Sequence, residues 1–197
     1  MKKFLGNTHA IPFSTFFIGL TLFGLVGCAQ TPNQVILSPQ VQSPIGHVYT
    51  NQAINITTQD MRTGNHIIQI LRKDEAATLY SANLPIDRVL GQSVKQYFKD
   101  QGLLISSQAG ITMRVTVDKA MVSVHQELMN YQAVSEIELR VEIARNEQTL
   151  TTEFNSKGTS EGPLNADLAV LERDLNQQLG KLVVEIANHK DVKQFIR

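Results

Sequence analysis

The middle of the chain alternates between apolar and polar residues, and this pattern constrains the fold more than any other feature. The alternation runs from Ile111 to Val124 and again from Tyr131 to Ile143. Successive side chains of a strand point to opposite faces, so each run predicts a strand with one buried and one solvated face. Within the first run the apolar positions shift by one residue. Such a shift is typical of a β-bulge, which we expect near Asp118–Ala120.

Shorter strands are predicted on both sides of this region. Their patterns of apolar residues are bounded by turn-forming residues, as in strands of antiparallel sheets. The predicted strands are Val48–Thr58, His66–Arg72, Ala77–Tyr80, Leu103–Ser106 and Thr149–Ser156. The stretch Gly158–Pro163 contains two glycines and a proline, and we expect it to form a loop.

Two segments have the spacing of amphipathic helices. Pro85–Gln101 and Asn165–His189 each place apolar residues three and four positions apart. Asn165 is a candidate N-cap of the second helix. Gly180 lies inside that helix, where it is either simply tolerated or needed for close packing against a strand. A short terminal turn is expected at Asp191–Ile196. The fold class is therefore α+β: a single domain with a mostly antiparallel sheet and two long helices packed on one face, in the order strands, helix, strands, helix.

The N-terminus has the features of an exported protein. Lys2 and Lys3 precede an apolar run that ends at Leu25-Val26-Gly27-Cys28. A positive start, an apolar core and small residues at the exit predict a signal peptide over residues 1–27. The exit resembles the bacterial lipobox, in which the cysteine is acylated and becomes the new N-terminus. We therefore predict Cys28 as the lipidation site, with the acyl chains embedded in the membrane. Residue 29 is Ala rather than Asp, which favours the periplasmic face of the outer membrane.

Residues 28–45 are predicted to be a lipidated cysteine followed by a tether rich in Pro and Gln. Prolines at 32, 39 and 44 disfavour both helix and sheet. Fully stretched, this tether would reach roughly 50 Å. It contains one apolar patch, Val35, Ile36 and Leu37, which is either a strand at the edge of the domain or a docking segment for a partner. The α+β periplasmic domain is predicted to occupy residues 46–197.

The predicted mature chain shows no arrangement of residues that indicates catalysis. Its histidines are isolated, and no phosphate loop, calcium loop or nucleophile elbow is present. We therefore expect no enzymatic activity, no metal and no cofactor. Eighteen Lys and Arg balance eighteen Asp and Glu, so we expect no nucleic-acid partner. Glu136, Glu138 and Glu142 form an acidic row on the solvated face of a predicted strand, which serves either solubility or binding of a partner.

Three segments together resemble the YajG-like family of Gram-negative outer-membrane lipoproteins. They are the lipobox Leu25–Cys28, the helix end and strand start Tyr97–Leu103, and the tail Asp191–Ile196. The resemblance covers most of the predicted mature domain. No activity is assigned to this family, so the resemblance supplies no catalytic residues. Its order of strands and helices is similar to that of small lipoproteins that serve as accessory subunits of envelope machines.

Two functions remain open at this stage. The first is a non-enzymatic accessory or structural subunit that binds a protein partner in the envelope, for example within a secretion system, through Val35–Leu37 or the acidic row. An open sheet edge would suit the addition of a partner's strand. The second is a periplasmic carrier of a small apolar or lipid ligand. A carrier needs a hollow between the helices and the sheet, whereas the leucine stripe of the second helix favours a filled core.

Overall fold

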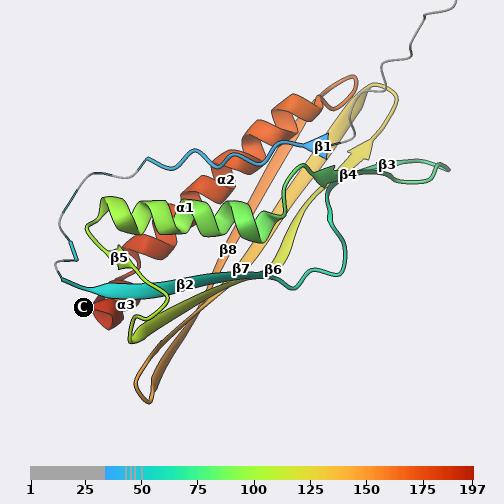
Figure 1. The fold of residues 1–197 in the computed structure, drawn as a ribbon. Helices are drawn as coiled ribbons and strands as arrows, with labels where there is room; N and C mark the ends of the chain where they lie inside the picture. The colour runs from blue at the N-terminus through green and yellow to red at the C-terminus, as the bar shows by residue number, and fades with distance from the viewer. Residues whose placement is uncertain (1–33, 43, 45, 47, 50) are drawn as a thin grey trace, which may run out of the picture. The chain divides into compact units, whose positions relative to one another are not determined.

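Three strands of sixteen residues each form the largest part of the sheet. In the computed structural model, β6 (Ile111–Gln126), β7 (Asn130–Arg145) and β8 (Gln148–Pro163) follow one another as an antiparallel meander (Figure 1). The structure describes residues 34–42, 44, 46, 48–49 and 51–197. The predicted signal peptide, Cys28 and the first residues of the predicted tether lie outside this range.

The bulge predicted from the alternation is confirmed. The pairing of β6 with β7 shifts register between Val117 and Lys119, which leaves Asp118 as the extra residue. On both sides of the shift the apolar residues face the interior, because the inserted residue restores the phase of the strand. The ladder between β7 and β8 continues through sixteen residue pairs with no shift in register.

The sheet is mixed, which corrects the expectation of a mostly antiparallel sheet. Four of the seven strand pairings are parallel. β2 (Ala53–Asp60) lies parallel to the first half of β6, and β3 (His66–Arg72) lies parallel to its second half. β2 and β3 therefore cover one side of β6 in succession. Alternation of apolar residues shows which face of a strand is buried, but it does not show the direction of the neighbouring strand.

Arg62 joins these two strands at the position of the bulge. Its guanidinium donates to both carboxylate oxygens of Asp60, with the shorter contact at 2.8 Å, and to the carbonyl oxygens of His66 and Ala120. Only 8% of the Arg62 side chain is exposed. One side chain thus binds a carboxylate of β2, a carbonyl oxygen of β3 and a carbonyl oxygen of the bulged strand β6.

Three short strands complete the sheet. β4 (Thr78–Ala82) is antiparallel to β3, and β1 (Gln34–Val35) is parallel to β4. β5 (Leu104–Ile105) pairs with the start of β2 at the opposite end of the sheet. The path through the sheet is therefore β1-β4-β3-β6-β2-β5, with β7 and β8 added on the free side of β6.

Among the described residues, three helices accompany the sheet. α1 (Ile86–Asp100) and α2 (Leu168–Asn188) lie on the same side of the sheet in Figure 1, and α3 (Lys190–Ile196) follows where a terminal turn was expected. The N-cap of α2 is Asp167, whose carboxylate accepts from the backbone N–H of Ala169, rather than the predicted Asn165. The buried stripe of α2 joins the apolar faces of β6 and β7 in one core.

Tyr49 gives the core a dependence on alkaline pH. Its ring is buried and packs against Phe98, with ring centroids 5.8 Å apart. Within the described part of the chain, its hydroxyl has no hydrogen-bond partner. Burial raises the pKa of Tyr49 from 10.0 to about 12, with smaller opposing effects of Arg197, which lowers it, and Tyr97, which raises it.

We expect the wild-type protein to lose stability as the pH rises from 10.0 towards about 12. In this window Tyr49 ionises in the unfolded chain but not in the folded one, so unfolding becomes more favourable. A Tyr49→Phe variant lacks this component and should be at least as stable at neutral pH. Urea unfolding of both proteins across the window measures the difference. Parallel losses of stability in the two proteins would contradict this assignment.

Candidate interaction surfaces

The apolar patch of the predicted tether is part of the fold. Val35 and Leu37 are buried in the core, and only Ile36 presents its side chain to solvent. Gln34 and Val35 form β1, so the patch includes a strand at the sheet edge, the first of the two alternatives from the sequence. The structure therefore leaves Ile36, 56% exposed, as the residue of this patch that another molecule can reach.

Residues 34–42, here called the strap, are held by side chains of α2. The backbone N–H groups of Ile36 and Ser38 donate to Glu172 and Asn176, at 2.8 and 2.7 Å. The Asn176 amide also donates to the carbonyl oxygen of Ile36 at 2.8 Å. The backbone of an irregular segment needs such partners when it lies against the protein. The strap is therefore bound at specific positions along the helix.

Gly180 allows the strap to lie directly on α2. A Cβ atom at this position would come within 2.5 Å of the Gln40 carbonyl oxygen and 3.2 Å of its carbonyl carbon. Real Cβ atoms do not approach backbone atoms so closely, so a larger residue would displace the strap. Of the two explanations considered for this glycine, close packing is correct, but its neighbour is the strap rather than a strand.

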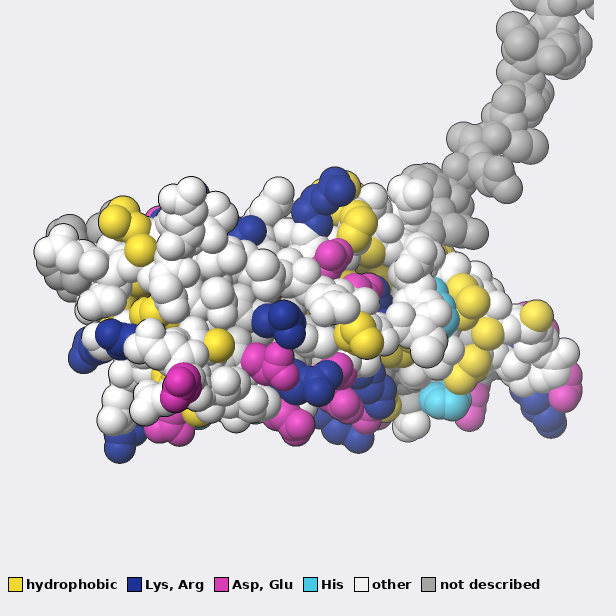
Figure 2. All heavy atoms as spheres, turned by 60° about the horizontal axis from the view of Figure 1, so that its bottom comes forward, with side chains coloured by type: hydrophobic (Ala, Val, Ile, Leu, Met, Phe, Trp, Pro, Cys, Tyr) yellow, Lys and Arg dark blue, Asp and Glu magenta, His cyan; other side chains and the backbone are white. Residues whose placement is uncertain are grey.

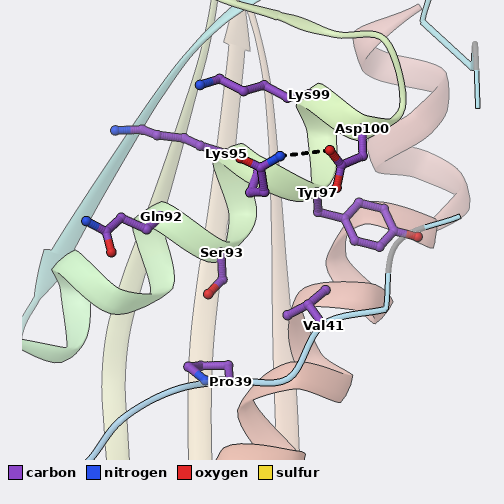
Figure 3. Close-up of a pocket in the computed structure, with 9 residues that line it drawn as sticks. Pro39, Val41, Gln92, Ser93, Lys95, Tyr97, Lys99 and Asp100 are labelled. Atoms are coloured by element: carbon purple, nitrogen blue, oxygen red, sulfur yellow. Dashed lines mark hydrogen bonds between the residues drawn. The ribbon is translucent and has the colours of Figure 1, made fainter. Parts of the chain in front are cut away.

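A groove of about 560 Å³ runs between the strap and α1. In Figure 3, Pro39 and Val41 line its strap side, and Gln92, Ser93 and Lys95 belong to its α1 side. The side chains of Lys95 and Lys99 extend away from the strap, and the Gln96 amide donates to Asp100 at 2.8 Å (Figure 3). Amides, hydroxyls and aliphatic carbons line this open groove, together with the charged residues Lys95, Lys99 and Asp100.

The acidic row lies on the outer face of the sheet, where cations from neighbouring strands pair with it. Glu136 contacts Lys119 at 2.5 Å and Lys157 at 3.1 Å. Glu138 lies 3.9 Å from Lys119, and Glu142 lies 3.4 Å from Arg114. Figure 2 shows acidic and basic side chains intermixed along this face. The three glutamates therefore form part of a face of alternating charge rather than a free acidic surface.

These contacts shift the pKa values of Glu136 and Lys119. The hydrogen bond from Lys119, followed by that from Lys157, lowers the pKa of Glu136 below its usual value. The hydrogen bond to Glu136 raises the pKa of Lys119. Both groups therefore keep their charges at neutral pH. Since the pair is exposed to solvent, its contribution to stability is small and decreases with salt.

The outer edge of β8 is the longest free edge of the sheet. Among the residues that the structure describes, β8 pairs with β7 alone, and its sixteen residues contain no bulge and no proline before Pro163. Natural proteins usually protect such edges by short strands, bulges, prolines or charges, and of these β8 has the charges of Glu153, Lys157 and Glu161 on its exposed face. The predicted loop Gly158–Pro163 is wrong, because these residues continue β8. No apolar residue marks this part of the strand, so the sequence carried no alternation from which it could be recognised.

The space between α2 and the sheet is mostly filled. The buried residues of the α2 stripe are Leu171, Leu175, Leu179, Leu182, Val183 and Ile186. A pocket of about 190 Å³ lies between α2 and strands β7 and β8, and Ser135, Gly158 and Gln178 are among the residues that line it. Pockets that enclose small ligands usually measure about 300 to 1,000 Å³ and are mostly apolar. The geometry thus gives a carrier function little support.

The residues that the structure describes contain neither a group of candidate metal ligands nor a candidate membrane-spanning helix. In that part of the chain, no three His, Cys, Asp or Glu side chains are grouped as metal ligands would be. None of the helices at positions 34–197 has the length and apolar composition needed to cross a membrane.

Comparisons with known proteins identify relatives across nearly the whole chain. A family model described as "Uncharacterized lipoprotein" matches residues 39–197. The uncharacterized lipoprotein YajG of Escherichia coli K12 is 19% identical over 180 residues, which cover 90% of this chain and 93% of that protein, and its counterpart from strain O6:H1 matches equally. The crystal structure of protein XCC0632 from Xanthomonas campestris is similar in fold, with a TM-score of 0.60, 14% identity, and coverage of 82% of this chain and 95% of that chain.

Proposed function

Because this chain belongs to the YajG-like family of uncharacterized lipoproteins, we propose that it is an accessory protein of the outer membrane that binds a protein partner and catalyses no reaction. Lipoproteins of this kind are anchored to a membrane of the cell envelope. We further propose that Cys28 carries the acyl chains and that the domain faces the periplasm. Ala29 after the lipidated cysteine favours the outer membrane over the inner one.

The free edge of β8 is the observation that supports partner binding. An extended segment of another protein can add to such an edge as a further strand, with hydrogen bonds between the two backbones. The adjoining residues on the outer face are Thr, Asn, Lys and Glu, so a partner strand with polar side chains on that face fits best. The acidic row contributes little to this contact, because neighbouring cations already pair with it. A partner of this kind would place the protein within a larger envelope assembly, such as a secretion system.

Crosslinking in intact cells tests this function. A photoreactive amino acid replaces Asn155, on the exposed side of β8, in the full acylated protein, and crosslinked partners are identified by mass spectrometry. A matched protein carries the same group at Arg173, on the exposed side of α2. A Cys28→Ala variant removes the anchor. We expect a stoichiometric partner at Asn155 that is absent at Arg173 and lost without the anchor.

Other outcomes of this experiment argue against the proposal. Equal crosslinking at Asn155 and Arg173, or crosslinks only to abundant porins and lipid, would exclude β8 as a specific binding edge. In that case the alternative of a carrier for an apolar ligand should be examined by extracting lipid from the purified protein.

A further inference from the structure

Three large apolar side chains lie in solvent at one end of the sheet. Leu128 is 96% exposed, Met129 72% and Leu164 61%. Leu128 and Met129 belong to the turn between β6 and β7, and Leu164 follows the last residue of β8. The backbone N–H of Leu164 donates to the carbonyl oxygen of Met129 at 2.8 Å, so the two segments are directly joined. We call these three residues the apolar tip.

A buried glutamine fixes the shape of the apolar tip. The amide nitrogen of Gln126 donates to the carbonyl oxygens of Glu127, Asn130 and Leu164, at 2.8, 3.1 and 2.8 Å. Its amide oxygen accepts from the N–H of Ala166 at 2.9 Å. Only 8% of Gln126 is exposed. A loop that merely joins two strands does not need this bracing, whereas a loop that presents side chains to another surface benefits from it.

The backbone of Leu164 is strained. Its φ angle is +63°, in the left-handed region that residues with a side chain rarely adopt. The hydrogen bonds from Leu164 to Met129 and from Gln126 to Leu164 hold it there. As a result, an exposed leucine is kept in an unfavourable conformation beside two further exposed apolar residues. Such local strain is most often retained where it positions a functional group.

The apolar tip lies at one end of the sheet, and the N-terminus of β1 points towards this end. β3 and β6 are parallel and both end here, with Arg72 opposite Gln126. β4 runs back from this end, and β1 is parallel to β4. Cys28 precedes Gln34 by six residues, which can span at most about 20 Å. Gln34 lies, through Ser81, at the level of the start of β3, so these six residues bring a bilayer that holds lipid on Cys28 to this end of the domain when they run nearly fully extended towards it.

We propose that the apolar tip inserts into the surface of the bilayer that holds the acyl chains of Cys28, and thereby orients the domain on the membrane. This inference rests on the proposed lipid anchor. The two leucines and the methionine of the apolar tip suit the boundary between headgroups and acyl chains, where apolar side chains leave water.

The charges near the apolar tip favour an apolar rather than an electrostatic contact. Glu127 is the charged residue of the turn itself, and the neighbouring turn between β3 and β4 carries Lys73, Asp74 and Glu75. With Arg72 at the end of β3, two cations stand against three anions, which gives no net attraction to anionic lipid. Insertion should therefore persist when the ionic strength is raised, unlike the binding of a basic patch.

Fluorescence of a label on the apolar tip tests this inference in the full acylated protein. The protein is reconstituted into vesicles of phosphatidylethanolamine and phosphatidylglycerol. An environment-sensitive dye is attached through a Leu128→Cys substitution, which changes a side chain that is almost wholly exposed. The matched control carries Leu104→Cys, which replaces a leucine 63% exposed at the opposite end of the sheet. We expect a blue shift at position 128, and severalfold stronger quenching by lipid-borne quenchers than at position 104.

The outcomes separate this inference from the anchor itself. Flotation of the vesicles and mass spectrometry show independently whether Cys28 is acylated and holds the protein on the membrane. If the protein floats but the label at position 128 behaves like that at position 104, the insertion is refuted and the anchor stands. A blue-shifted label that lipid-borne quenchers do not reach also refutes it, because a protein then covers the apolar tip. Loss of the signal at high salt would contradict the apolar contact.

Discussion

An Arg62→Ala substitution is expected to lower the free energy of unfolding by about 3 to 5 kcal/mol, the usual cost of removing one partner of a buried ion pair. The guanidinium is buried and pairs with Asp60 at 2.8 Å. Its loss also leaves the carbonyl oxygens of His66 and Ala120 without this donor. The gap between β2 and β3 at the bulge of β6 would then have no group to fill it.

Denaturant unfolding of wild-type and variant proteins measures this effect. The matched control is Arg114→Ala, which removes an exposed ion pair between β6 and Glu142 of β7 on the outer face of the sheet. Such a pair contributes about 1 kcal/mol or less. Similar losses in both variants would show that Arg62 has no special role at the bulge. An Arg62→Lys variant should recover only part of the loss, because an ammonium group cannot reach all three acceptors in the fixed geometry of the guanidinium.

A Gly180→Val substitution is expected to release the strap and to destabilise the protein by about 3 kcal/mol, through overpacking and loss of buried area. The new side chain would collide with the backbone of Gln40. Without the strap, Val35 and Leu37 leave the core, and Asn176 loses its contacts with Ile36 and Ser38. Cleavage within residues 34–42 by a protease should accelerate as the stability falls.

A smaller substitution at the same position also tests the collision with the strap. In a free helix, replacing Gly with Ala stabilises by about 1 kcal/mol. Gly180→Ala should instead destabilise, since its Cβ is enough for the collision. Gly110→Ala is the control, because a Cβ there meets no atom within 4 Å. Thermal unfolding and limited proteolysis of the three variants decide the question, and a stabilised Gly180→Ala variant would disprove the contact.

The elements predicted most accurately were those whose pattern depends only on local burial. The alternation from Ile111 to Ile143 identified β6 and β7 together with their bulge, and helical spacing identified α1 and α2 to within about three residues. The parallel pairing of β2 and β3 with β6 was missed, because it depends on which chain segment occupies the neighbouring position. The end of β8 was missed because residues 157–163 contain glycine and proline and no alternating apolar residues, so that only pairing with β7 identifies them as a strand.

The candidate surfaces were predictable only in part. The exposure of Glu136, Glu138 and Glu142 follows from their phase in β7, but their pairing with Lys119, Lys157 and Arg114 depends on the register across three strands. The strap was expected to be a tether because Pro39 and Pro44 disfavour regular structure. Lack of regular structure does not prevent a segment from binding to a helix face. The partners are distant in sequence: Asn83 accepts from Leu37 across 46 residues, and the side chains of α2 bind the strap across 136 or more.

The position of those partners has a consequence for the order of events during biosynthesis. Glu172, Asn176 and Gly180 belong to the last part of the chain, whereas the strap follows the proposed anchor almost at once. In a chain exported from its N-terminus, the strap can pair with β4 and Asn83 early, but its contacts with α2 form only after that helix has crossed the inner membrane and folded. Once the strap binds, the chain free between Cys28 and the domain shortens from a reach of roughly 50 Å to one of about 20 Å. Completion of folding would then draw the domain towards the lipid surface, which couples maturation of this protein to its distance from the membrane.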